Sequence, residues 1–257
     1  MSVQLLDKTR KINRLLRDTQ TSKVVFNDIC EEIGSVLMSN MLVISRKGKI
    51  LGVGLYASVP PLDEFFSHVV GELLLPEMNE RFLSVLSTNE NVNLAALGFP
   101  EACAGAYYAI VVPIEIAGER LGTVFLYKTT CAYGIDDIII SEYSTTVVGL
   151  EMMRAMKEED AEEARKRQLA QSAIGTLSGS EVEAIRHVLA ELGDQEGILV
   201  ASKIADRYGI TRSVIVNAIR KFESAGLIES HSSGMKGTYI KIMNETVLDE
   251  MEKISGP

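Results

Sequence analysis

The side chains whose types and spacing best suit a chemical task lie between positions 200 and 226. Apolar residues recur there at helical spacing in two short segments, and Tyr208-Gly209-Ile210 separates them with a glycine suited to a tight turn between helices. Thr211 stands where a helix N-cap belongs, so the second helix opens with residues that contact base edges and phosphates in DNA. The spacing therefore predicts a helix-turn-helix whose DNA-facing residues are Thr211, Arg212, Ser213, Asn217 and Arg220.

Two strand-like runs follow the second helix. They cover residues 227–230 and 238–242, and a polar, glycine-bearing loop from 231 to 237 joins them. Two strands after such a helix predict a wing. We assign Lys203, His231 and Lys236 to contacts with the DNA backbone, and the alternative for His231 is a bystander in a mobile wing.

The charge distribution agrees with this interpretation once it is divided along the chain. The whole chain carries a net charge of −9, but residues 200–243 contain seven Lys and Arg against three Asp and Glu. Attraction to phosphates depends on a local basic face, and an acidic remainder limits non-specific binding to DNA.

Composition excludes several other classes of protein. With 257 residues, 46% hydrophobic and 24% charged, the chain can form two ordinary globular domains. No apolar run is long enough for a membrane span and no signal peptide is evident, so we expect a cytoplasmic protein. Cys30, Cys103 and Cys131 lack the spacing of a disulfide framework or a zinc site, and we interpret them as buried hydrophobic residues. Catalytic and metal-binding motifs are missing, so an enzyme is not expected.

The first half of the chain predicts an antiparallel sheet backed by helices. A basic amphipathic helix opens it, and an apolar insertion from 60 to 76 interrupts it. The other expected elements are helices at 26–38 and 80–86 and strands at 40–45, 49–53, 109–116 and 121–127.

One long helix is expected to connect the two halves. It runs from about 137 to 172 without proline, and its charged middle pairs Glu162 with Lys166 and Glu163 with Arg167. We therefore predict an α+β protein with a ligand-sensing domain at 1–136, a linker helix at 137–172 and a winged helix-turn-helix domain at 173–257.

At this point the residues support a resemblance to a known family. Residues 200–207, 209–218, 223–226 and 234–241 resemble the CodY family of bacterial global transcriptional regulators, and looser matches extend over the rest of the chain. The resemblance implies a GAF domain in the first half and adds Ala201 and Ser202 to the expected DNA contacts. It also implies a homodimer, mainly a repressor, whose affinity for DNA rises with branched-chain amino acids, chiefly isoleucine, and with GTP.

For the amino acid, the resemblance implies a pocket formed by Glu64, Phe65, Leu75, Pro76, Leu97, Phe99 and Pro100. The family holds the ligand carboxylate with an arginine, and Glu64 falls on or beside that position. Because an anion repels a carboxylate, we expect isoleucine to bind weakly or not at all. The pocket then either takes another small ligand or is filled by its own apolar side chains.

For GTP, the resemblance implies Ser45, Arg46, Lys47, Lys49, Glu151 and Lys157. Three cations on a tight turn suit phosphates, although a solvated basic turn has the same composition. No Walker loop is present, so bound GTP would be sensed and not hydrolysed.

These observations favour a ligand-responsive regulator that binds double-stranded DNA as a homodimer or higher homo-oligomer. The alternative is a ligand-binding or interaction module whose winged domain docks a protein partner. Steep weakening of binding by salt would distinguish the first from the second.

Overall fold

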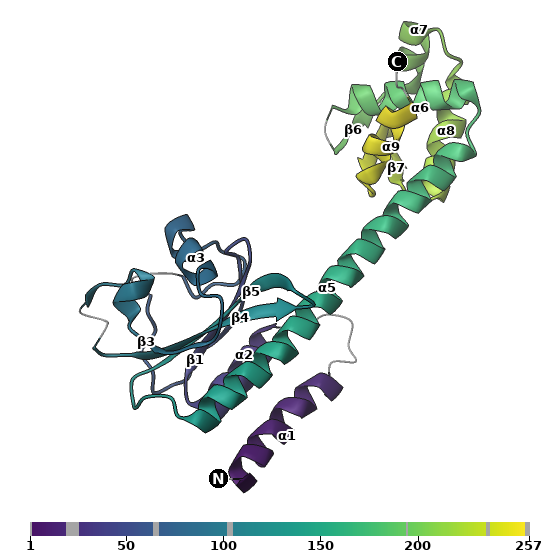
Figure 1. Cartoon of the computed structure of the whole chain (residues 1–257). Helices are drawn as coiled ribbons and strands as arrows, with labels where there is room; N and C mark the ends of the chain where they lie inside the picture. Colours follow the sequence, from purple (N-terminus) through teal and green to yellow (C-terminus); the bar gives the residue numbers. More distant parts are fainter. Residues whose placement is uncertain are drawn as a thin grey trace. The chain divides into compact units, whose positions relative to one another are not determined.

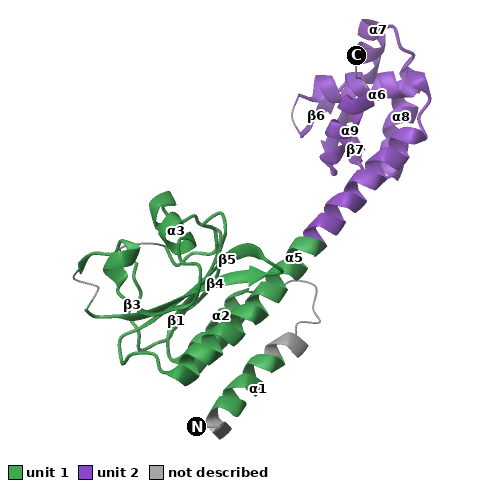
Figure 2. Cartoon of the chain, viewed as in Figure 1, with its two compact units in different colours: residues 1–157 green, residues 158–257 purple. Residues whose placement is uncertain are grey.

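The structure is a computed structural model that describes residues 2–18, 26–63, 67–101, 105–193, 195–234 and 237–254. It divides into two compact units, residues 1–157 and 158–257 (Figure 2). The boundary falls inside one helix, which runs through both units. No helix among the described residues is long and apolar enough to cross a membrane.

Unit 1 is a five-stranded antiparallel sheet with helices (Figure 1). The strand order is β2-β1-β5-β4-β3, so the long hairpin β4–β5 provides two of the three inner strands. The elements are α1 (Ser2–Asp18), α2 (Phe26–Leu37), β1 (Asn40–Ser45), β2 (Ile50–Gly54), α3 (Pro76–Leu83), β3 (Asn89–Val92), the 3-10 helix η1 (Leu94–Leu97), β4 (Tyr108–Ile116), β5 (Glu119–Lys128) and α5 (Ile135–Gly175).

Strand β5 shows how the sheet buries both of its faces. Val124 and Leu126 point into a cluster with residues of α2 and α5, whereas Phe125 and Tyr127 point into a second cluster with α3 and η1. Alternate residues of a strand face opposite sides, so one apolar run fills two cores. Unit 1 therefore consists of a sheet between two layers, with α5 on one side and the insertion on the other.

The turn between β4 and β5 is shorter than the sequence indicated. Ala117 and Gly118 both have positive φ, at 53° and 80°, as the two central residues of a type I′ hairpin turn require. Glu119 and Arg120, which we had included in the turn, instead pair with Ile116 and Glu115 in the ladder.

Some predicted boundaries were wrong. The helix expected at 80–86 begins at Pro76, because proline is favoured in the first turn, and ends at Leu83. Strand β3 was not predicted, since its Asn89, Glu90 and Asn91 are exposed and show no apolar alternation. Cys30 is buried as expected, and burial raises the pKa of its thiol, but Cys131 is exposed. Cys103 lies outside the described residues.

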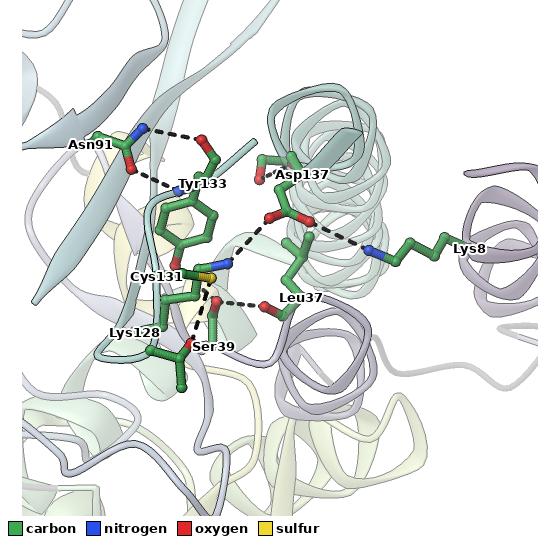
Figure 3. A network of polar contacts seen from close by, with 10 residues as sticks. Lys8, Leu37, Ser39, Asn91, Lys128, Cys131, Tyr133 and Asp137 are labelled. Atoms are coloured by element: carbon green, nitrogen blue, oxygen red, sulfur yellow. Dashed lines mark hydrogen bonds and ion pairs between the residues drawn. The ribbon is translucent and has the colours of Figure 1, made fainter. Parts of the chain in front are cut away.

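A polar network joins the start of α5 to the sheet and to α1 (Figure 3). The Lys128 ammonium, whose side chain is 1% exposed, donates to Asp137 Oδ2 at 3.2 Å and lies 4.1 Å from the centre of the Tyr133 ring. Asp137 Oδ1 accepts from Lys8 Nζ at 3.4 Å, and the Tyr133 hydroxyl donates to Ser39 at 2.8 Å. Burial raises the pKa of Tyr133.

Unit 2 packs helices α6 to α9 and the end of α5 around one apolar core with a three-stranded sheet. The strand order is β6-β8-β7, so the predicted wing of two strands gains a third strand that the sequence did not indicate. After α5, the elements are α6 (Gly179–Leu192), β6 (Glu196–Leu199), α7 (Ala201–Tyr208), α8 (Arg212–Ser224), β7 (Ile228–Ser232), β8 (Thr238–Ile242) and α9 (Thr246–Ile254).

Candidate DNA-binding surface and effector sites

The turn between α7 and α8 has the geometry that its glycine predicts. Gly209 ends α7 with a φ of 67°, and the next residue, Ile210, donates its N–H to the carbonyl of Ala205 at 3.2 Å. A left-handed residue at this place is the usual end of a helix, and glycine adopts it without a steric cost. Only three residues therefore separate α7 from α8.

Thr211 occupies the N-cap of α8 by its extended backbone, but its hydroxyl does not cap the helix. The hydroxyl lies 3.3 Å from that of Ser213, and the helix begins at Arg212, directly after the predicted N-cap position. Both hydroxyls are thus exposed beside the free N–H groups of the first turn. A helix N-terminus with exposed donors is suited to a phosphate.

Helix α8 has one buried face and one exposed face. Ile215, Ala218, Ile219 and Phe222 are buried in the core of unit 2. On the other face the side chains are exposed, and they are the ones predicted to face DNA: Arg212, Ser213, Asn217 and Arg220. Arg212 and Asn217 therefore do not contribute to the core of unit 2.

The basic residues between positions 200 and 243 fall into two groups. Among the described residues, Lys203, Arg212 and Arg220 have no ion-pair partner, whereas three other cations do. Lys221 donates to Glu181 Oε2 at 2.7 Å and to the carbonyl of Thr176 at 3.1 Å. Arg207 pairs with Glu191, and Lys241 lies 3.9 Å from Glu196. The charge available to DNA is therefore smaller than the count of cations in the sequence.

The remaining predicted DNA contacts have different surroundings. Ser202 is exposed, but Ala201 is partly buried and packs against the core. His231 lies in β7, and not in the loop as expected, with Nε2 3.0 Å from Glu229 Oε1 and its ring stacked on that of Tyr239. Lys236 lies outside the described residues.

The residues expected around the amino acid differ in burial. Leu97 and Phe99 are 4% and 3% exposed, and the Phe99 ring stacks on Phe125. Leu75 is 66% exposed, and Pro76 and Pro100 are exposed as well. Glu64 and Phe65 lie outside the described residues.

The basic turn expected to hold nucleotide phosphates connects β1 and β2. Ser45 accepts the Lys49 N–H on its hydroxyl at 3.0 Å, so this hydroxyl stabilises the turn. Arg46, Lys47 and Lys49 are exposed, and no ion pair to them occurs in the part of the chain that the structure describes. Three cations therefore remain available on one turn.

Glu151 on α5 is the other residue expected at the nucleotide site. Its side chain is 8% exposed, and its Oε2 has no hydrogen-bond donor among the described residues, with Arg154 Nη1 at 3.9 Å. A buried carboxylate oxygen without a donor destabilises the fold, because its lost hydration is not replaced, and a bound donor would remove this cost.

Glu151 and the basic turn share a neighbour. The Arg46 N–H donates to the Leu121 carbonyl at 2.8 Å, and Leu121 packs in the same cluster as Met152 of α5. A Cβ at Gly149 would meet Ile116 Cγ1 at 2.8 Å, which confirms how closely α5 approaches the hairpin. The hairpin β4–β5 thus brings both predicted parts of the site to one end of the sheet. Lys157 is exposed further along α5.

A sheet flanked by helices, followed by a helix-turn-helix whose second helix exposes unpaired cations, defines a two-domain DNA-binding regulator. Comparison with known proteins agrees. Residues 4–176 match the family model of the CodY GAF-like domain, and residues 195–255 match that of the CodY helix-turn-helix domain. The chain belongs to the CodY family of transcriptional regulators, and it is a DNA-binding regulator and not an enzyme.

Full-length relatives support the same assignment. The chain is 45% identical over 255 residues to the global transcriptional regulator CodY of Clostridium perfringens (strain SM101 / Type A), and 49% identical over 255 residues to that of Clostridium tetani (strain Massachusetts / E88). Each alignment covers 97% of this chain and 98% of the relative. A solved structure, the cofactor-binding GAF domain of the nutrient sensor CodY from Clostridium difficile, is 36% identical; it covers 59% of this chain and 99% of that chain, with a TM-score of 0.43.

Proposed function

We propose that the protein regulates nutrient-responsive genes, mainly as a repressor, by binding operator DNA through the exposed face of α8 under the control of small effectors. The observation that carries this proposal is the exposed Arg212 at the first turn of α8, which has no ion pair among the described residues and adjoins Ser213, one helical turn before Asn217. A regulator of this kind acts in the cytoplasm, where bacterial DNA lies.

The roles of the side chains follow from their chemistry. Arg212 and Asn217 have the donors and acceptors that read base edges in the major groove, and bidentate pairs of this kind discriminate bases by about 1–3 kcal/mol. Ser213 and the free N–H groups of the first turn suit a phosphate, which positions the helix without reading sequence. Lys203 and Arg220 add phosphate contacts. A homodimer, as the family resemblance implies, would read two half-sites of a palindrome.

Charge reversal at Arg212 tests the DNA surface. Arg212→Glu should abolish binding to operator DNA while the thermal unfolding midpoint stays unchanged, because the side chain is exposed and unpaired. Arg186→Glu is the matched control, since Arg186 is an exposed cation on α6 whose ion-pair partner among the described residues is Glu183, at 3.7 Å. Normal operator protection by Arg212→Glu would refute the surface, and binding that resists salt would favour docking of a protein partner.

More of the described residues support a role for GTP than a role for the amino acid. Exposed Arg46, Lys47 and Lys49 suit the phosphates, and the carboxylate of Glu151, whose buried Oε2 has no donor among the described residues, has the two acceptor oxygens that the N1–H and amino group of guanine require. In calorimetry, Glu151→Gln should lower the affinity for GTP more than the affinity for ATP. The amide of glutamine replaces one of the two acceptor oxygens by a donor. Equal loss for both nucleotides would refute the guanine contact.

For the amino acid, we propose that Glu64 makes isoleucine a poor ligand, because the ligand carboxylate would enter beside a like charge. Glu64→Arg discriminates between the alternatives: it should improve isoleucine binding if only the carboxylate partner is missing, and it should change nothing if the cavity is filled. Micromolar isoleucine binding by the unmodified protein, measured by calorimetry, would show that another residue holds the carboxylate.

A further inference from the structure

An open pocket of about 460 Å³ lies between the end of α3 and the segment that carries β3 and η1. It includes Leu97 of the expected amino-acid site but none of the other residues of that site. Its walls combine one arginine, several hydroxyl groups and apolar side chains, among them Arg81, Ser84, Val85, Thr88, Val92 and Leu97.

The arginine of this pocket packs against a glycine. Its Nη1 lies directly against Gly98, where a Cβ would overlap it, and Gly98 has a φ of 92° that favours glycine. Within the described ranges, the Arg81 guanidinium takes part in no hydrogen bond and no ion pair. Its backbone is fixed at the end of α3, because Ser84 Oγ donates to the Arg81 carbonyl at 2.6 Å.

A second arginine explains why Arg81 remains free. The carbonyl groups at the end of a helix attract cations, but Arg120 already donates Nη1 to the Val85 carbonyl at 2.9 Å and Nη2 to the Phe82 carbonyl at 3.4 Å. Arg120 also donates to Gly122 and Thr123, so its guanidinium is fully engaged within the fold. The charge of Arg81 is therefore available for a ligand.

The chemistry of the walls restricts which ligand fits. Val92 and Leu97 are 7% and 4% exposed and provide an apolar wall. Among the described residues that line the pocket, none is acidic. A carboxylate with an aliphatic tail matches this combination, because the guanidinium binds carboxylates in a bidentate manner and the tail meets Val92 and Leu97. The ammonium group of an amino acid would find no anionic partner.

We propose that this pocket, which we call the Arg81 pocket, binds a small aliphatic carboxylate of charge −1, such as a branched 2-oxo acid, in preference to the corresponding amino acid. The site does not depend on Glu64 or on the proposed roles of the basic turn. It gives the protein a place to sense a carbon skeleton before or after transfer of its amino group.

Calorimetry on the full chain with 3-methyl-2-oxopentanoate and with isoleucine tests the proposal. We expect the oxo acid to bind and Arg81→Gln to weaken it by about tenfold or more, as expected for loss of a charged hydrogen-bonding partner. Arg81→Lys should retain part of the affinity, since it keeps the charge and loses the planar fork. Arg10→Gln is the control: it removes an exposed cation of α1 in the same unit and outside the pocket, and it should bind the oxo acid as the unmodified protein does.

Three results would overturn the proposal. They are the absence of oxo-acid binding, equal binding by the unmodified protein and Arg81→Gln, and binding of isoleucine at least as tight as that of the oxo acid. Unfolding does not complicate the comparison, because an exposed side chain without partners contributes little to stability, and a thermal melt of each variant checks this. None of these results bears on the DNA-binding surface, which Arg212→Glu tests independently.

Discussion

The N–H of Leu74 donates a hydrogen bond of 2.9 Å to the carbonyl of Gly48, and this bond joins the insertion before α3 to the basic turn between β1 and β2. Ile50 donates to Glu72 at 2.9 Å and accepts from Gly71 at 2.8 Å, so the join is a short stretch of backbone pairing. The segment expected beside the amino acid and the turn proposed for GTP therefore cannot move independently.

Gly48→Ala tests this join. Gly48 has a φ of 82°, and a Cβ there would meet Asn79 at 3.1 Å, whereas Gly118 has a φ of 80° and open space around it. In both alanine variants the free energy of unfolding, measured with urea, should fall by about 1 kcal/mol, because alanine is strained at a positive φ. Only Gly48→Ala should also lower the affinity for GTP measured by calorimetry, because the added methyl group displaces the turn. Equal GTP affinity in both variants would contradict a role of the turn in binding.

The buried ion pair at the start of α5 gives a second prediction. Asp137→Asn should destabilise the protein by about 2–3 kcal/mol, because it leaves the Lys128 ammonium buried without a counter-charge, and the partial exposure of Asp137 moderates the loss. Adding Lys128→Met should recover most of that loss, since a methionine fits an apolar site. Chemical unfolding of the two single variants and the double variant measures the coupling. Additive losses would mean that the pair does not act as a unit.

The third prediction concerns acid. The hydrogen bond from Lys221, followed by that from the Ser178 backbone, lowers the pKa of Glu181 from 4.5 to about 2. A lowered folded-state pKa stabilises the fold above about pH 4.5, and this contribution disappears as the pH falls toward 2. Lys221→Met should raise the pKa of Glu181, followed by NMR of its carboxyl group, and shift acid unfolding of unit 2 to higher pH. Lys203→Met, which removes an unpaired cation, should leave both unchanged.

In DNA binding, Lys203→Met should have the larger effect and Lys221→Met the smaller one. Lys203→Met should reduce the slope of log K against log salt by about 1, because one phosphate contact is lost. Lys221→Met should leave the slope close to that of the unmodified protein, since Lys221 is already paired with Glu181. Titration of duplex DNA at several salt concentrations gives the slopes. A larger change for Lys221→Met than for Lys203→Met would show that the division of cations into two groups is wrong.

The parts of the fold that follow from periodicity were predictable from the sequence. The spacing of Ile215, Ile219 and Phe222 places the buried face of α8, and this fixes Arg212 and Asn217 on the opposite face. The ion pairs Glu162–Lys166 and Glu163–Arg167 also occur as predicted, because their spacing of four residues decides them locally. Which residues contact DNA stays a prediction.

Features that depend on contacts between distant residues were not predictable. Nothing in the sequence near Lys221 indicates that Glu181, forty residues earlier, neutralises it. Strand β6 has only four residues, and it is a strand because β8 provides partners for Glu196 to Leu199. In the same way, the free guanidinium of Arg81 depends on Gly98 and Arg120, which come from two other elements.

In the single chain, α5 has a stretch from 156 to 169 in which every side chain is exposed. Besides its own hydrogen bonds and pairs of opposite charges, the stretch is contacted near its end by Asn244, which donates to the Lys166 carbonyl at 2.8 Å, and by Glu250, 3.8 Å from Arg167. The exposed part before these contacts is below the length of about 12–15 residues at which an isolated helix becomes marginal in water. Its amides should therefore exchange with deuterium faster than those of α5 on either side. Any ligand or partner that lowers this exchange would act on the regulator through the entropy of a melting helix, without changing the folded shape of either unit.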